Sequence, residues 1–214
     1  MRLSAEALSV TRGERPLFAG LSFALEPGDA LVLTGPNGSG KSSLLRLMAG
    51  FGRPAAGRIA WNGAPIGDDL EAYRAQLHYV GHQEALKPAL SPLETLRFWA
   101  DLAGRPLEDA DRPLQTLGLA RAAATPCRFL SSGQRRRLAL ARLLAWAAPL
   151  WLLDEPTVGL DDEALRLIAG LIERQRAAGG IVLLSTHQPL PLGAAQSLSI
   201  ADFPPPRPVA SMAW

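Results

Sequence analysis

The stretch Gly35-Pro36-Asn37-Gly38-Ser39-Gly40-Lys41-Ser42 follows an apolar run at residues 30–34 and precedes residues 43–48, which have the composition of a helix. A strand, a glycine-rich turn and a helix in this order predict a loop that binds nucleotide phosphates. The glycines let successive backbone N–H groups point at one anion, and the helix N-terminus adds positive dipole charge. Lys41 would supply a mobile charge for the terminal phosphates, and Ser42 a hydroxyl for Mg²⁺. A plain strand-to-helix turn is the alternative, which the flanking strand and helix disfavour.

A pair of acids follows a second apolar run. Residues 150–153 predict a buried strand, and Asp154 and Glu155 come directly after it. Consecutive side chains of a strand face different ways, and a turn after the strand can aim both toward the phosphates. Asp154 would hold Mg²⁺ through its water shell, and Glu155 would polarise the attacking water as general base. The alternative is a strand that simply ends at solvent.

Two more segments carry groups that could reach a phosphate. Ser131 and Gly133 precede the amphipathic residues 135–145, so they would lie near a helix N-terminus, which favours anions. An ordinary serine and glycine cap is the alternative. His187 follows the apolar residues 181–185 and could contact a terminal phosphate, although a histidine at a strand end is more often structural.

Composition sets broad limits on the function. The chain has 214 residues, 48% hydrophobic and 20% charged, which suits one large globular domain, or a domain with a modest inserted lobe. The net charge of +2 gives little support to a nucleic-acid surface, and none is predicted. A single cysteine, Cys127, forms no internal disulfide and fits a reducing compartment. We expect no secretion signal and no membrane span, because the most apolar window, residues 143–153, would cover roughly 16 Å as a helix.

The remaining patterns predict how the chain is organised. Residues 3–10, 21–25 and 58–61 favour antiparallel strands, with a turn at residues 12–16, whereas the apolar residues 30–34, 150–153 and 181–185 favour a parallel sheet. Ser91, Pro92 and Glu94 form the start signal of a helix, within a helical insert at about residues 84–146. The first 203 residues are expected to form one domain, and the proline-rich residues 204–214 an irregular tail.

Together, these motifs resemble those of the ATP-binding-cassette ATPases in order and spacing, over nearly the whole chain. The resemblance implies an α/β fold: a P-loop NTPase core with a mixed or parallel sheet, an N-terminal antiparallel β subdomain and an inserted helical subdomain. It implies ATP and Mg²⁺ as ligands. The residues that it assigns are the phosphate loop Gly35–Ser42 with Ser43, the glutamine Gln83, the signature Ser131, Ser132, Gly133 and Gln134, the acids Asp154 and Glu155, the D-loop residue Asp161, and the switch histidine His187.

The same resemblance assigns roles to these groups. Lys41, Gln83, Glu155 and His187 are the catalytic residues that it implies, and Ser42, Gln83 and Asp154 are the implied metal ligands. Two positions depart from the family pattern. Ser132 stands where a glycine is usual and can still cap the helix, and Arg12 stands where an aromatic ring commonly stacks on adenine, a contact that a guanidinium can also make.

Partners also follow from the resemblance. In the family, the signature of one copy closes on nucleotide in the phosphate loop of a second copy, so hydrolysis is expected to need a dimer. The permease is expected on separate, integral membrane subunits, which places this chain at the cytoplasmic face of a bacterial inner membrane. Residues 83–91 are the expected docking surface for such a subunit, with a simple connector as the alternative.

Local strings resemble one branch of the family, the ATP-binding subunits of bacterial cytochrome c maturation complexes, often called haem exporters. They are Arg15-Pro16-Leu17-Phe18, Tyr79-Val80-Gly81-His82-Gln83, Pro92-Leu93-Glu94-Thr95-Leu96-Arg97-Phe98-Trp99 and Leu130-Ser131-Ser132-Gly133-Gln134-Arg135-Arg136-Arg137. This resemblance implies ATP-driven export of haem or release of its chaperone adduct. No residue is assigned as a haem ligand, because the chain has no Cys-x-x-Cys-His string.

Three other functions remain open at this point. One is an ATPase motor for an exported lipid, lipoprotein or drug. Another is a soluble ATPase that acts on DNA or ribosomes, which usually carries a second cassette, a long coiled coil or a basic extension. The last is a nucleotide-gated module without catalysis, which the intact Lys41, Ser42, Asp154, Glu155 and His187 disfavour.

Overall fold

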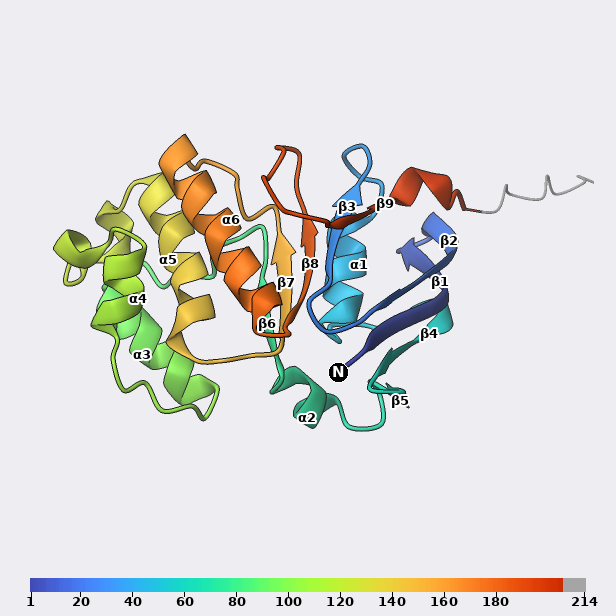
Figure 1. Cartoon of the computed structure of the whole chain (residues 1–214), viewed down its shortest axis with the longest axis horizontal. Helices are drawn as coiled ribbons and strands as arrows, with labels where there is room; N and C mark the ends of the chain where they lie inside the picture. Colours follow the sequence, from blue (N-terminus) through green and yellow to red (C-terminus); the bar gives the residue numbers. More distant parts are fainter. Residues whose placement is uncertain (206–214) are drawn as a thin grey trace, which may run out of the picture.

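The computed structural model describes residues 1–205 of the chain and contains two β-sheets with helices on either side of the larger one (Figure 1). The smaller sheet is antiparallel, in the order β2-β1-β4-β5. Its strands are β1 (Leu3–Arg12), β2 (Arg15–Leu25), β4 (Ala56–Trp61) and β5 (Ala64–Pro65). The first two strands run further than predicted, because Thr11 pairs with Pro16 and Arg12 with Arg15, so the turn contains only residues 13 and 14.

The larger sheet is parallel and has the order β6-β7-β8-β3-β9. Its strands are β3 (Ala30–Thr34), β6 (Leu77–Val80), β7 (Leu150–Asp154), β8 (Ile181–Ser185) and β9 (Gln196–Ser199). The predicted strands at residues 30–34 and 181–185 are confirmed without change, and the third extends one residue further, to Asp154. Because β3, β7 and β8 are neighbours and parallel, their carboxyl ends meet at one edge, where the predicted polar motifs follow.

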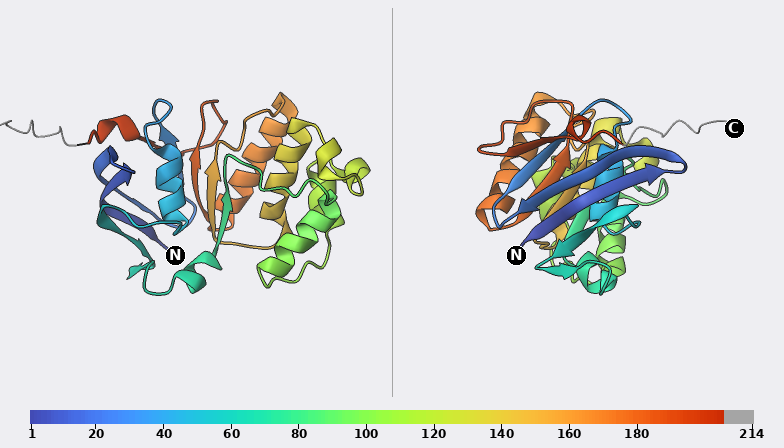
Figure 2. Two further views of the ribbon diagram at one scale, coloured as in Figure 1. Left: turned by 180° about the vertical axis from the view of Figure 1, so that it is seen from behind. Right: turned by 90° about the vertical axis from the view of Figure 1, so that its right-hand side faces the viewer.

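The helices form two layers around this sheet (Figures 1 and 2). They are α1 (Lys41–Met48), α2 (Leu70–Arg74), α3 (Pro92–Leu102), α4 (Asp111–Thr116), α5 (Ser132–Ala145) and α6 (Asp162–Ala177), with 3₁₀ turns at Ala120–Ala122, Cys127–Phe129 and Ile200–Asp202. One core lies between the two sheets and contains the apolar side of α1. A second core joins the opposite face of the parallel sheet to α3, α4, α5 and α6.

The start of α3 confirms its predicted signal. Ser91 Oγ accepts a hydrogen bond from the backbone N–H of Glu94, whose carboxylate accepts one from the N–H of Ser91 in return. This capping box satisfies two amide donors that a helix otherwise leaves unpaired. The segment predicted as a helical insert, residues 84–146, contains α3, α4 and α5, which lie together at one end of the molecule (Figure 1).

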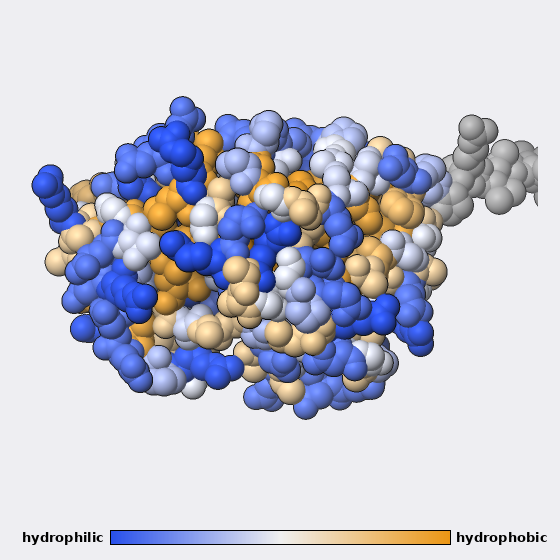
Figure 3. Space-filling model, in the orientation of Figure 1, coloured by the Kyte–Doolittle hydropathy of each residue, from blue (hydrophilic) through white to orange (hydrophobic). Residues whose placement is uncertain are grey.

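The helix predicted to follow Ser131 is confirmed, and α5 begins at Ser132, ahead of the amphipathic residues 135–145. The predicted proline-rich tail, residues 204–214, lies outside the described residues apart from its first two positions. In the part of the chain that the structure describes, no helix is both long and apolar enough to cross a bilayer. Figure 3 shows mostly hydrophilic residues on one face, with apolar residues gathered in the gaps between them.

His78 of β6 is the most deeply buried histidine and sits against the inserted helices. Its side chain is fully buried, its Nε2 lies 3.0 Å from the carbonyl oxygen of Trp146, and its ring packs on the Trp146 ring. Burial lowers the pKa of His78 to about 4, with the charges of Arg142 and Arg105 acting in the same direction, against the hydrogen bond to Trp146. His78 is therefore neutral in the folded protein at neutral pH.

This burial predicts a loss of stability on acidification. The unfolded chain takes up a proton at His78 below about pH 6.5 and the folded chain only near pH 4, so stability is complete above pH 6.5 and falls as the pH drops between these values. At pH 5 the expected loss at this residue is about 2 kcal/mol. Urea unfolding at pH 7.5 and pH 5 should show a larger decrease for the parent than for His78→Gln, which can still donate to Trp146. An equal decrease in both proteins would contradict the assignment.

Candidate functional site

The phosphate loop connects the end of β3 to the start of α1, as predicted. Gly35, Gly38 and Gly40 have φ angles of 133°, 79° and 114°, values that residues with a side chain rarely adopt. A Cβ atom at Gly40 would also lie 3.0 Å from the ring of Phe18. The glycines are therefore required both by the backbone conformation and, at Gly40, by close packing against β2.

Lys41 is held in the loop by its own backbone. Its side chain is 7% exposed, and Nζ donates to the carbonyl oxygens of Gly35 at 2.8 Å and Pro36 at 3.3 Å. An ammonium group carries one donor more than these two contacts use. The charge thus lies at the mouth of the loop, where it can contact a phosphate without first being drawn out of the core.

Asp154 connects three elements at the end of the parallel sheet. Its Oδ1 accepts hydrogen bonds from Ser42 Oγ at 3.0 Å and Ser185 Oγ at 2.8 Å, and the residue is 2% exposed. Among the described residues, no hydrogen bond uses Oδ2, which is free for the hydration shell of a cation. A hydroxyl and a carboxylate oxygen are the hard donors that Mg²⁺ accepts while keeping several waters. The predicted metal ligands Ser42 and Asp154 are thus joined by a hydrogen bond and fit Mg²⁺.

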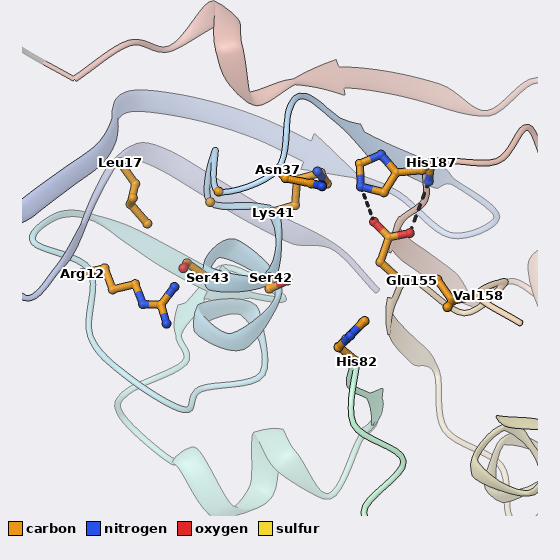
Figure 4. Close-up of a pocket in the computed structure, with 12 residues that line it drawn as sticks. Arg12, Leu17, Asn37, Lys41, Ser42, Ser43, His82, Glu155, Val158 and His187 are labelled. Atoms are coloured by element: carbon orange, nitrogen blue, oxygen red, sulfur yellow. Dashed lines mark hydrogen bonds and ion pairs between the residues drawn. The ribbon is translucent and has the colours of Figure 1, made fainter. Parts of the chain in front are cut away.

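Glu155 has an unusual backbone conformation, with φ at 51°. Such a conformation costs a residue with a side chain on the order of 1–3 kcal/mol and persists where neighbours fix it. Here the N–H of Glu155 donates to the carbonyl oxygen of Ser185 at 3.1 Å and to its Oγ at 3.0 Å. With this backbone, the carboxylate points to His187, and both residues line the same cavity as the phosphate loop (Figure 4).

The carboxylate of Glu155 contacts His187 at two points (Figure 4). Oε2 accepts the backbone N–H of His187 at 3.2 Å, and Oε1 lies 3.2 Å from Nε2 of its ring. Glu155 is 8% exposed, whereas half of the His187 side chain is exposed. The imidazole therefore faces the open side of the site while its partner lies at the base, and the two predicted catalytic residues are in direct contact.

These groups line one cavity of about 440 Å³. This volume lies within the range of cavities that take a small molecule. The lining residues are Arg12, Leu17, Asn37, Gly38, Gly40, Lys41, Ser42, Ser43, His82, Glu155, Val158 and His187 (Figure 4). The cavity thus joins residues of the antiparallel sheet, among them Arg12, with the phosphate loop and with segments that follow strands of the parallel sheet.

Three of the lining residues were not assigned from the sequence: Leu17, His82 and Val158. His82 lines the cavity and its neighbour Gln83 does not, although Gln83 was the predicted residue. Both are exposed, on the segment that follows β6. The chain bends at both residues after β6 ends at Val80, so no sequence periodicity could have pointed to His82.

The signature residues lie outside this cavity. Ser131 caps α5: its Oγ accepts the N–H of Gln134 at 3.2 Å, and the side chain of Gln134 accepts the N–H of Ser131 at 2.8 Å. Asp161 caps α6 with its own side chain alone, whose Oδ1 accepts the N–H of Ala164 at 2.8 Å. The two caps are close, since a Cβ atom at Gly133 would lie 3.2 Å from the carbonyl oxygen of Gly159. Ser131 and Asp161 are exposed, and neither of them lines the cavity.

A buried arginine connects α5 to the acids. Arg136 is 3% exposed, and its guanidinium donates to the carbonyl oxygens of Gly81, Asp154, Glu155 and Pro156 at 2.9, 2.8, 2.5 and 3.3 Å. Burial lowers the pKa of Arg136, and the carboxylates of Glu84, Asp154 and Glu155 oppose that shift. The sequence did not separate this residue from Arg135 and Arg137 beside it.

Comparison with known proteins identifies the family. Residues 18–158 match the ABC transporter family. The cytochrome c biogenesis ATP-binding export protein CcmA of Rhodospirillum rubrum is 54% identical over 94% of this chain and 87% of its own length. The protein of the same name from Paramagnetospirillum magneticum is 52% identical over 94% of both.

Solved structures agree on the fold. An ATP-binding subunit of an ABC transporter aligns with a TM-score of 0.78 and 28% identity, over 87% of this chain and 80% of that one. A Pyrococcus furiosus chain described as a putative ABC transporter ATP-binding protein aligns with a TM-score of 0.83, at 23% identity, over 96% of this chain and all of that one. The chain therefore belongs to the ABC transporter family of ATPases, where it resembles cytochrome c biogenesis ATP-binding export proteins, as its local strings predicted.

Proposed function

We propose that this chain is the ATP-hydrolysing motor of a cytochrome c maturation exporter, acting on haem or its chaperone adduct at the cytoplasmic face of a bacterial inner membrane. Members of its family bind ATP, generally with Mg²⁺. The observation that carries the proposal is the identity of about half of its residues with cytochrome c biogenesis export proteins over nearly the whole chain. The alternative cargoes and the nucleic-acid function have no comparable support.

The cavity suggests how hydrolysis proceeds. The N–H groups of the phosphate loop and Lys41 would bind the triphosphate. Ser43, in the first turn of α1, lines the same cavity and would lie beside it. Ser42 and Asp154 would hold Mg²⁺, which neutralises phosphate charge when bound. Glu155 would orient the attacking water and accept its proton, and His187 would contact the terminal phosphate from the open side.

One chain supplies half of each complete site in this proposal. Ser131 and Asp161 lie on an exposed surface outside the cavity, so Ser131 would contact the terminal phosphate only in a second copy. Ser131 would then add a hydroxyl, and α5 its positive dipole end, to the charge developing on the opposite side of the phosphate.

The docking surface, residues 83–91, has a physical connection to the signature. Backbone N–H groups of Cys127 and Arg128 donate to the carbonyl oxygens of Leu90 at 2.8 Å and Pro88 at 3.0 Å. Ser131 follows these residues closely in sequence. A membrane subunit bound at residues 83–91 would therefore move with the segment that leads into α5.

Glu155→Gln should reduce turnover by about 10²- to 10⁴-fold, the usual contribution of a general base. ATP should still bind, because Lys41 and Ser42 are unchanged. Steady-state ATPase assays and equilibrium nucleotide binding measure the two effects. Glu108→Gln, the same substitution at an exposed loop residue between α3 and α4, serves as control. A Glu155→Gln protein that turns over at the parental rate would exclude this role.

Hydrolysis should depend on association of two chains. The rate per chain should rise with concentration, and Ser131→Arg should remove turnover while dilute, monomeric protein keeps its ATP affinity. Lys41→Ala should instead weaken ATP binding in the monomer, because Lys41 lies in the cavity itself. Light scattering gives the oligomeric state in the same samples. A rate that stays constant in demonstrably monomeric protein would refute the shared site.

Purification of the tagged chain from bacterial membranes tests the cargo. Cytochrome c maturation proteins should be recovered with the parent and with Lys41→Ala, whose docking surface is intact. They should be lost with Ala89→Arg, a change at an exposed residue of segment 83–91. Recovery of an unrelated permease would overturn the proposed cargo and leave the ATPase assignment intact.

A further inference from the structure

Arg136 is a buried charge. Within the described part of the chain, its side chain forms hydrogen bonds with backbone carbonyls rather than with carboxylates. It comes from the second turn of α5, the helix that Ser131 caps, so it moves with the signature as part of one rigid element. Its four acceptors belong to the segment after β6, to the last residue of β7 and to the turn that follows β7. One guanidinium therefore joins the inserted helices to two segments that lead into the cavity.

The backbone of Glu155 is fixed from two sides. Ser185 of β8 accepts its N–H with both oxygens, and Arg136 of α5 donates to its carbonyl at 2.5 Å. Glu155 keeps its φ of 51° between these contacts. Because the direction of the carboxylate follows from that backbone, a displacement of α5 changes where the carboxylate points.

The contact to Gly81 acts on the other wall of the cavity. Arg136 donates to the carbonyl oxygen of Gly81 at 2.9 Å, directly before His82, which lines the cavity, and Gln83. The planar guanidinium has several donors in a fixed fork, and a lysine ammonium cannot reproduce that geometry. The arrangement thus depends on arginine itself and not on positive charge alone.

We propose that Arg136 is a positioning residue that sets the geometry of Glu155 and of the segment at Gly81, and so makes hydrolysis depend on the position of α5. The proposal rests on the proposed role of Glu155 as general base. It assigns Arg136 no contact with ATP. Its loss should therefore lower kcat and leave ATP binding nearly unchanged.

Arg136→Lys tests this with its charge retained. A misplacement of about 1 Å at a reacting group can cost about 10²-fold in rate, so we expect kcat to fall at least about 10-fold with ATP affinity within about 2-fold of the parent. Arg137→Lys is the matched control, because it is the same substitution on the next residue of α5. Arg137 donates to the carbonyl oxygen of Leu117 beside α4, and within residues 1–205 it forms no hydrogen bond or ion pair with Asp154 or Glu155. It should keep parental turnover.

Chemical rescue separates positioning from general stability. Arg136→Ala leaves space for a free guanidinium ion, so millimolar guanidinium should restore part of its kcat, whereas methylammonium at the same concentration should not. Thermal unfolding of every variant, with and without ATP, identifies the folded samples. If Arg136→Ala does not fold, the comparison of Arg136→Lys with Arg137→Lys still decides.

Parental kcat in folded Arg136→Lys would overturn the proposal, and so would an equal loss of kcat in Arg137→Lys. A loss of ATP affinity in proportion to kcat would overturn it as well. Glu155→Gln is assayed in the same experiment. It distinguishes a failure of the positioning role of Arg136 from a failure of the general-base role of Glu155. Low turnover in Glu155→Gln with normal turnover in Arg136→Lys rejects only the positioning role, whereas normal turnover in Glu155→Gln rejects the general base on which that role rests.

Discussion

The bond network of the Asp154 carboxylate is the interaction on which the site depends. Asp154 ends β7, Ser185 ends β8 and Ser42 lies in the first turn of α1, and one buried oxygen of Asp154 accepts a hydrogen bond from each serine hydroxyl. A buried carboxylate is stable only where polar partners replace its water. The hydrogen bonds therefore fix the ends of two parallel strands and the first turn of a helix relative to one another, and the phosphate loop lies where they meet.

The second constraint is that two parts of the fold, the parallel sheet and α5, both form hydrogen bonds to the backbone of Glu155. Ser185 holds the amide of Glu155 from the parallel sheet, and Arg136 holds its carbonyl from α5. The parallel sheet also contains β3, from which the predicted phosphate loop follows, and α5 carries the exposed cap at Ser131. Neither the sheet nor α5 alone determines the geometry of Glu155. An ATPase whose activity responds to a partner needs such a residue, which contacts from two parts of the fold position together.

Sequence patterns predicted the fold well where local chemistry decides structure. Uninterrupted apolar runs identified the central strands, and the Ser91 and Glu94 pair identified the start of α3. The edge strand β9 was not predicted, because its sequence, Gln-Ser-Leu-Ser, has only one apolar residue and its pairing depends on β3. The short helix α2 was missed as well, since five residues give little periodicity.

The site was predictable as a set of residues and less so as an arrangement. The left-handed backbone of Glu155 leaves no mark in the sequence, because it is imposed by neighbours that are distant along the chain. Likewise, three successive arginines look alike until the rotation of α5 is known, and only the middle one is buried. His82 and Gln83 differ by one position, and the backbone direction after β6 decides which of them lines the cavity.

The capping box at Ser131 has a consequence for assembly. Because Oγ accepts the N–H of Gln134, the hydroxyl hydrogen remains free, while the χ1 rotation of the serine is already restricted. A second chain that meets this surface finds a donor whose orientation was decided when α5 folded. Little conformational entropy then remains to be lost at that contact. The affinity of the proposed dimer would therefore depend mainly on the larger surfaces around it.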